Sequence, residues 1–286
     1  MNGSVLPPRT ERGAENQLNR GRGRLPARDG ADTEDLPVRV GDAGDAFLSL
    51  LVGGVLWEIG ARLLHFSFFP PLSGVLRAVV ELTASGQIAS NLGRSLVSLA
   101  IGYGLAVTSG VTLGMLMGRY RWVECVMEPY VNALLAAPKL IFVPIVYALF
   151  GLGRGTQVAI VFLSAFFVIV VNAMAGMRTV DQTCVEMARS FGASERQLFW
   201  RVLLPGSMPL TMAGLRLGMG QAVKGMINGE MFIALFGLGA LLRKYGGRFD
   251  SERVFAILLV VVSVALVCSW VIEAIERRVT AWTGNR

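Results

Sequence analysis

The sequence predicts an all-α polytopic membrane protein with about six transmembrane helices. Hydrophobic residues make up 53% of the 286-residue chain and charged residues only 16%, and the mean hydropathy is +0.55. Soluble domains carry about one quarter charged residues, so this composition excludes an ordinary soluble domain. Several runs of roughly 20 apolar residues, the length that spans a bilayer core, follow one another along the chain.

Residues 1–45 differ in composition from the rest of the chain. They are rich in Gly, Arg, Asp and Glu and almost lack aromatic and β-branched residues, so they cannot bury a core. We expect a disordered cytoplasmic N-terminal tail. It does not read as a signal peptide, because the first apolar run begins only near Ala46 and no small-residue cleavage pattern follows it.

Six apolar runs are interpreted as spans, and the first of them opens a membrane domain of residues 46–286. Within the first run, Glu58 and Arg62 are one helical turn apart and can form an ion pair. The aromatic residues and prolines of His65–Pro71 suit an exit at the membrane interface, and a short surface helix is expected at Val75–Gln87. The six runs are 46–64, 95–117, 126–150, 156–177, 209–236 and 254–275.

The third run should be kinked or broken, because it contains Pro129, Pro138 and Pro144. Proline removes a helical hydrogen bond and its ring clashes with the preceding turn. Broken backbone at membrane depth is tolerated where it is buried in protein or lines a cavity.

Six spans place both termini on one side of the membrane. Arginines gather between the spans and after the last one, and the positive-inside rule places such loops in the cytoplasm. The loop with Arg243, Lys244, Arg248 and Arg253 is an exception, since it falls outside. We predict a multi-pass protein of the inner (plasma) membrane, in contact with lipid, with cytoplasmic N- and C-termini.

Nothing in the sequence indicates an enzyme. Cys125, Cys184 and Cys268 are far apart and His65 has no ligand-spaced neighbour, so neither a metal site nor a disulfide framework is expected. There is no G-x-x-x-x-G-K-[ST] loop for ATP, no Ser/His/Asp set and no pair of acidic residues. The basic residues are scattered, which argues against nucleic-acid binding. We expect the chain itself to bind no cofactor.

One polar segment, residues 181–206, lies between the fourth and fifth spans. Its centre reads E-M-A-R-S-F-G-A-S-E-R-Q-L-F-W-R-V-L-L-P. Thr183-x-x-Glu186 and Ser194-x-x-Gln197 match capping boxes, and Gly192 is placed to end the first helix. Pro205 is placed to stop the second helix. The pattern predicts two capped helices joined at a glycine hinge, which is a docking surface rather than an active site.

This segment resembles the cytoplasmic signature of binding-protein-dependent ABC importer permeases. The signature reads E-x-A, three residues, Gly, nine residues, an aliphatic residue, one residue, then L-P. Its matching positions are Glu186, Ala188, Gly192, Val202, Leu204 and Pro205, whereas Met187 replaces the middle alanine. Short motifs elsewhere are similar to the nitrate/sulfonate/taurine class of these permeases. They are Ala136-Ala137-Pro138, Gly151-Leu152-Gly153, Gly192-Ala193-Ser194 and Gly237-Leu238-Gly239.

The resemblance implies a type I ABC importer permease fold. The 181–206 segment would couple to a cytoplasmic ABC ATPase, which binds the ATP. Two permease copies would form the pore, and an extracytoplasmic solute-binding protein would deliver a small anion such as a sulfonate, nitrate or taurine. The expected coupling residues are Glu186, Met187, Ala188, Gly192, Ala193, Ser194, Leu204 and Pro205. For Glu186 the residues alone favour a cap with Thr183, and the coupling role rests on the resemblance.

The fifth span carries two features on neighbouring faces. A stripe of small residues recurs at helical spacing and predicts close helix packing; it consists of Gly214, Gly218, Ala222, Gly225 and Gly229. Beside it lie Gln221, Lys224 and Asn228, which we interpret as bordering a translocation path for anions. A lysine at bilayer depth needs a cavity or a partner, and an interhelical salt bridge is the alternative. Glu230 is on the wrong side of the helix to pair with Lys224.

The residues leave other functions open. A stand-alone channel or secondary transporter would favour inverted repeats and intramembrane ion sites, but no clear repeat is found and the polar segment stays unexplained. A non-transporting membrane scaffold is a third possibility. Among importers, thiamine precursors, bicarbonate and aromatic acids remain alternative solutes.

Overall fold

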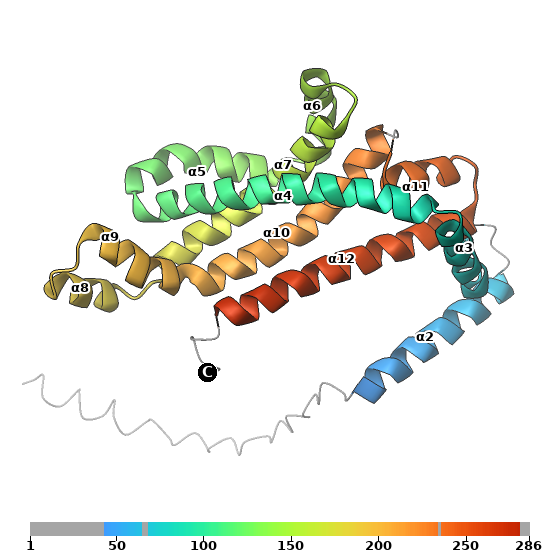
Figure 1. The fold of residues 1–286 in the computed structure, drawn as a ribbon, viewed down its shortest axis with the longest axis horizontal. Helices are drawn as coiled ribbons and strands as arrows, with labels where there is room; N and C mark the ends of the chain where they lie inside the picture. The colour runs from blue at the N-terminus through green and yellow to red at the C-terminus, as the bar shows by residue number, and fades with distance from the viewer. Residues whose placement is uncertain (1–42, 65–67, 234–235, 281–286) are drawn as a thin grey trace, which may run out of the picture. The chain divides into compact units, whose positions relative to one another are not determined.

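The computed structural model describes residues 43–64, 68–233 and 236–280, and the regular structure in these ranges is helical throughout (Figure 1). The chain divides into two compact units, Met1–Leu51 and Val52–Arg286. Most of the expected disordered tail lies outside the described residues; its last three positions begin helix α2 (Ala43–Leu64).

Helix α7 (Arg154–Arg178) is packed between two long helices, α4 (Gln87–Arg119) and α10 (Leu204–Ile233). The close approach depends on glycine. A Cβ at Gly102 of α4 would lie 2.7 Å from the Val158 carbonyl oxygen, and a Cβ at Gly114 would lie 2.5 Å from the Val170 carbonyl oxygen. Such distances leave no room for a side chain, so small residues let the backbones meet.

The small-residue stripe predicted for the fifth span packs against the other side of α7. A Cβ at Gly218 would lie 2.7 Å from Ile169 Cγ1, and Cβ atoms at Gly214 and Gly225 would collide with Asn172 and Ser164. Ala222 is completely buried. The packing interpretation of this stripe is therefore confirmed.

The third apolar run is bent, as its prolines predict. Helix α5 (Arg121–Ala136) is followed by a 3-10 turn, η1 (Lys139–Phe142), and by α6 (Val143–Phe150), with a bend of 97° at the break. The break falls at Pro138. Pro129 lies inside α5 without ending it, so that proline does not break the span.

By length and composition, three helices in the described ranges can cross a membrane alone: α4, α7 and α12 (Ser251–Val279). If α5 and η1–α6 cross the membrane together as one broken span, the described ranges contain four spans. The six predicted spans also include α2 and α10. Both are long helices, but each carries charged residues within it, such as Glu58 in α2 and Lys224 in α10.

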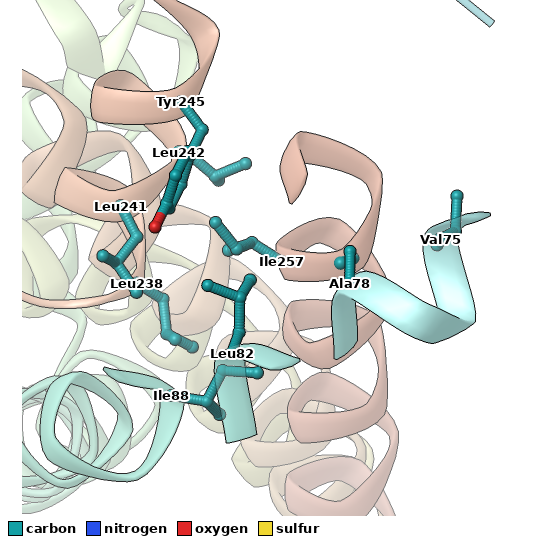
Figure 2. Packing of buried hydrophobic residues seen from close by; sticks show 10 residues of the cluster. Val75, Ala78, Leu82, Ile88, Leu238, Leu241, Leu242, Tyr245 and Ile257 are labelled. Carbon is teal, nitrogen blue, oxygen red and sulfur yellow. The ribbon is translucent and has the colours of Figure 1, made fainter. Parts of the chain in front are cut away.

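Helix α3 (Leu72–Ala84) is the short helix expected after the first span, and it packs on α12 and near α11 (Leu238–Gly246). Figure 2 shows Leu82 of α3 between Ile88 of α4 and Ile257 of α12, beside the leucines of α11. These contacts follow from the period of α3, whose apolar face repeats every three to four residues.

The predicted Glu58–Arg62 pair of α2 forms, at 2.6 Å. Glu58 also accepts hydrogen bonds from the backbone N–H and the hydroxyl of Ser73, at 3.0 and 2.8 Å. Trp57 donates its indole N–H to the Pro70 carbonyl at 3.0 Å. Two adjacent side chains of α2, Trp57 and Glu58, therefore hold the start of α3.

Candidate functional site

The polar stretch at residues 181–206, termed the hinged segment, folds as two short helices, α8 (Gln182–Ser190) and α9 (Glu195–Leu198). They lie at the opposite end of the α4–α7–α10 group from α11 (Figure 1). The first helix is capped by Asp181, whose carboxylate accepts from the Thr183 N–H at 2.8 Å. The predicted capping box of Thr183 and Glu186 is therefore wrong.

The physical reason lies in the position of Asp181. An aspartate is among the strongest N-cap residues, and it stands two residues before Thr183, so the helix starts earlier and Thr183 falls inside it. The hydrogen bond from Thr183 also holds the pKa of Asp181 below its usual value. The Glu186 side chain is exposed and makes no hydrogen bond or ion pair within the described part of the chain.

The hinge forms where the sequence predicts it. Gly192 has a φ of +76°, in the left-handed region that favours glycine. The Ala193 N–H bonds back to the Ala188 carbonyl at 3.0 Å, and the Gly192 N–H to that of Arg189 at 2.9 Å. These bonds satisfy the last carbonyls of α8 and give it a sharp end.

The second capping box is confirmed. The Ser194 hydroxyl accepts from the Gln197 N–H at 3.4 Å, and the Gln197 side-chain oxygen accepts from the Ser194 N–H at 2.9 Å. The backbone N–H groups of Ser194 and Gln197, at the start of α9, are thereby both paired. The start of α9 is fixed against the hinge.

Pro205 does not stop the second helix, contrary to the sequence prediction. A π-helical turn, η2 (Phe199–Leu203), joins α9 to α10, and Pro205 is the second residue of α10. Proline has no N–H and its ring crowds the carbonyl four residues earlier. The wider π turn before it relieves this conflict, so the helical path runs unbroken from Glu195 to Ile233.

The hinged segment is anchored to the helix ends by an apolar cluster. Val185 of α8 and Leu198 of α9 are buried with Met115 of α4 and Met177 of α7. Ala188 is partly buried against the same cluster. The two short helices therefore cannot move far without moving α4 and α7.

An ion-pair network adds to this anchor. Glu195 pairs with Arg119, the last residue of α4, and with Arg189 of α8 at 3.4 Å. The hydrogen bond from Arg119 holds the pKa of the Glu195 carboxyl below its usual range. The pairs are exposed, and exposed pairs contribute little free energy each, so they fix orientation more than stability.

Three apolar side chains of the hinged segment point away from the bundle. Phe191 is 85% exposed, Trp200 60% and Met187 55%. The sequence analysis did not single out Phe191 and Trp200 as surface residues. Both lie close to charged residues of the polar segment, and this position is the signal that could have found them. An apolar patch exposed on a surface is typical of an interaction site, so these three side chains are candidates for contact with a partner.

Gln221, Lys224 and Asn228 do come together, as predicted for the translocation path. They line one cavity of about 260 Å³ with Lys139 and Ser164. The Lys139 ammonium donates to the Ser164 carbonyl at 3.1 Å. Lys139 was missed in the sequence, although its place directly after Pro138, at the break of a span, is the signal that could have found it.

The salt-bridge alternative for Lys224 is not formed: none of the ion pairs among the described residues includes it. Glu230, as predicted, does not reach it. Instead the buried Glu230 carboxylate accepts from the Gly239 N–H at 2.9 Å, at the start of α11. Asn91 and Ser95 of α4 accept from the N–H groups of Gly237 and Leu238.

The described chain combines long apolar helices, a cavity lined by polar side chains and an anchored polar segment at one end of the bundle. The chain matches the family described as binding-protein-dependent transport system inner membrane component over residues 110–281 and belongs to it. It is therefore a membrane-embedded ABC importer permease and not a member of an enzyme family.

Relatives with named solutes support this assignment. The taurine transport system permease protein of Escherichia coli strain K12 is 28% identical over 237 residues, which cover 81% of this chain and 86% of the relative. The formylaminopyrimidine transport permease protein of Halalkalibacterium halodurans is 30% identical over 238 residues, covering 82% and 93%.

The fold is also that of a solved transporter. An inward-facing methionine ABC transporter matches with a TM-score of 0.53 and 19% sequence identity, covering 69% of this chain and 96% of that one. At this identity the likeness concerns the fold alone, which is the type I importer permease fold expected from the sequence.

Proposed function

We propose that this chain is the permease subunit that passes a small anion inward, driven by a separate cytoplasmic ABC ATPase. The observation that carries the proposal is the unbroken helical path from α9 through η2 into α10. One end of this path lies in the hinged segment and its middle lines the Lys224 cavity. A displacement at the segment is thereby delivered to the cavity as a rigid-body shift.

The exposed apolar side chains of the hinged segment form the docking surface for the ATPase. Phe191 stands next to the hinge, with Met187 one turn before it on α8. A buried aromatic or methionine anchor surrounded by charged residues is typical of protein interfaces. Glu186 acts here as an exposed contact residue, because its side chain has no partner within the described chain.

The solute is a small molecule with an anionic group, such as a sulfonate, nitrate or the zwitterion taurine with its sulfonate. A taurine permease is among the relatives, and Lys224 supplies a positive charge to the path without an acidic partner. The formylaminopyrimidine relative favours a second candidate, a thiamine precursor. The charge of the cavity favours the anion, because a neutral ring would leave the ammonium group unpaired.

The partner proteins and the orientation in the membrane follow from this role. An extracytoplasmic solute-binding protein delivers the solute, ATP stays on the partner ATPase, and two permease copies surround the path. The hinged segment and both termini face the cytoplasm, since most interspan arginines then lie inside. Apolar side chains of α12 such as Leu266 and Trp270 are exposed on the bundle and face lipid or the second copy.

Co-purification tests the proposal. A tagged permease co-expressed with its cognate ABC ATPase should retain that ATPase, and Phe191→Asp should reduce retention at least tenfold. Phe249→Asp is the matched control, because Phe249 is also an exposed phenylalanine but follows α11 at the other end. A stand-alone channel or secondary transporter would retain no ATPase in any variant, and that result contradicts the proposal.

A further inference from the structure

Lysine is rare in this chain and its distribution is uneven. Of 27 basic residues only Lys139, Lys224 and Lys244 are lysines. Two of the three line one cavity, at the break of the bent span and at mid-length in α10. Arg216, an arginine in the same helix as Lys224, is paired with Glu276 at 3.5 Å, whereas the described ion pairs include neither lysine of the cavity.

Among the described residues that line the cavity, none is acidic. Its lining is Pro138, Lys139, Leu140, Ile160, Ser164, Gln221, Lys224, Gly225 and Asn228. The Lys139 ammonium is held only by the Ser164 carbonyl, and Lys224 enters no ion pair in the ranges the structure describes. Two like charges that line one cavity repel each other unless a counter-charge lies between them.

An oxyanion would supply that counter-charge. Gln221 and Asn228 flank Lys224 on the same helix and offer amide N–H donors to the oxygens that the ammonium groups leave free. Hydrogen bonds between charged groups are the strongest of their kind. A lysine ammonium is a point charge with rotatable donors, whereas arginine forms a rigid two-pronged contact, so lysine suits a site that must release its ligand.

We propose that Lys139 and Lys224 form an anion-binding site of the permease itself, which bridges the single oxyanion headgroup of a sulfonate, nitrate or carboxylate. The inference rests on the proposed importer function and goes beyond it, since it gives the permease a share in selecting the solute. The cavity volume of about 260 Å³ is below the roughly 300–1,000 Å³ of drug-sized pockets, so the solute is small.

Calorimetric titration of the purified full-length permease in phosphatidylcholine nanodiscs tests this site. The probes are taurine, ethanesulfonate, nitrate and benzoate, with ethanesulfonamide as the neutral match to ethanesulfonate. At least one anion should bind, and the sulfonamide should not. Lys139→Gln and Lys224→Gln should each weaken binding at least tenfold, as expected for one charged hydrogen bond. Lys244→Gln, in α11 and outside the cavity, should bind like the wild type.

The inference is overturned by the absence of anion binding to the wild type, by equal binding of ethanesulfonamide, or by unchanged binding in a folded Lys139→Gln or Lys224→Gln variant. A lipid phosphate is the other source of the same chemistry. Ethanesulfonate binding that disappears when phosphatidylglycerol is added to the nanodiscs would assign the site to lipid and contradict the inference.

The two proposals fail separately. If the wild type retains the ATPase in the co-purification assay but binds no anion, only the lysine site is lost. If it binds an anion through both lysines but retains no ATPase, the importer function is lost and the anion site remains.

Discussion

At the residue scale, Glu195 joins the hinged segment to the end of a membrane helix. Its carboxylate pairs with Arg119 of α4 and with Arg189 of α8. Because the Arg119 hydrogen bond keeps the pKa of Glu195 low, the carboxylate stays charged well below neutral pH. Glu195 is therefore available to both arginines throughout the physiological pH range.

Glu195→Gln should loosen the hinged segment at neutral pH, seen as faster hydrogen exchange of the α8 and α9 amides. A carboxyl with a lowered pKa in the folded state stabilises that state above its ordinary pKa, and the contribution is lost as the pH falls through the lowered value. The difference between wild type and variant should therefore shrink on acidification below the ordinary range of glutamate.

Glu186→Ala is the control for this measurement, since Glu186 is exposed and does not cap α8 in the structure. Its exchange should equal that of the wild type. Equal exchange in Glu195→Gln at neutral pH would contradict the role given to Glu195, and faster exchange in Glu186→Ala would restore the capping box predicted from the sequence.

At the element scale, the hinge depends on one glycine. Gly192→Ala should lower the free energy of local opening of α8 by about 1–2 kcal/mol, the cost of a side chain in the left-handed conformation. Hydrogen exchange of the α8 amides measures it. Gly93→Ala, in the helical interior of α4 with open space around it, should show no loss, and an equal loss there would contradict the argument.

The packing of α4 on α7 depends on glycines of one face. A methyl group at Gly114 would lie 2.5 Å from the Val170 carbonyl oxygen, whereas nothing lies within 4 Å of the same position at Gly104. Gly114→Ala should therefore destabilise the bundle by about 1–3 kcal/mol, as overpacking does. Thermal unfolding in detergent should show a lower midpoint for Gly114→Ala than for Gly104→Ala; equal midpoints would contradict the packing.

Elements set by local chemistry could be predicted from the sequence. The break at Pro138, the hinge at Gly192 and the cap at Ser194 each follow from the conformational preference of one or two residues. The cap of α8 was misplaced because Asp181, two residues before Thr183, takes the N-cap position. The continuous helix past Pro205 was missed because a π turn depends on the packing around it.

The candidate site was only half predictable for a different reason. Gln221, Lys224 and Asn228 lie on one helix, so their spacing alone places them together. Lys139 comes from the bent span, and it lines the same cavity because α7 packs against both α10 and the bent span. Contacts between segments far apart in sequence depend on that packing, which residue spacing does not give.

At the scale of the whole molecule, continuous contacts join the proposed docking surface to the cavity. Phe191 is exposed beside the hinge, the anchoring cluster fixes the hinged segment to α4 and α7, and the helical path continues into the cavity wall. The family and the importer fold agree with this arrangement. The central claim is that force from the ATPase enters through this segment.

The most direct test is ATP hydrolysis by the reconstituted complex of permease and ATPase in proteoliposomes, measured with and without the loaded solute-binding protein. The account predicts that the binding protein stimulates hydrolysis several-fold with the wild type and with Phe191→Leu, which keeps an apolar anchor, and that Phe191→Asp abolishes the stimulation. Full stimulation with a folded Phe191→Asp permease would contradict the claim that the hinged segment transmits the ATPase motion.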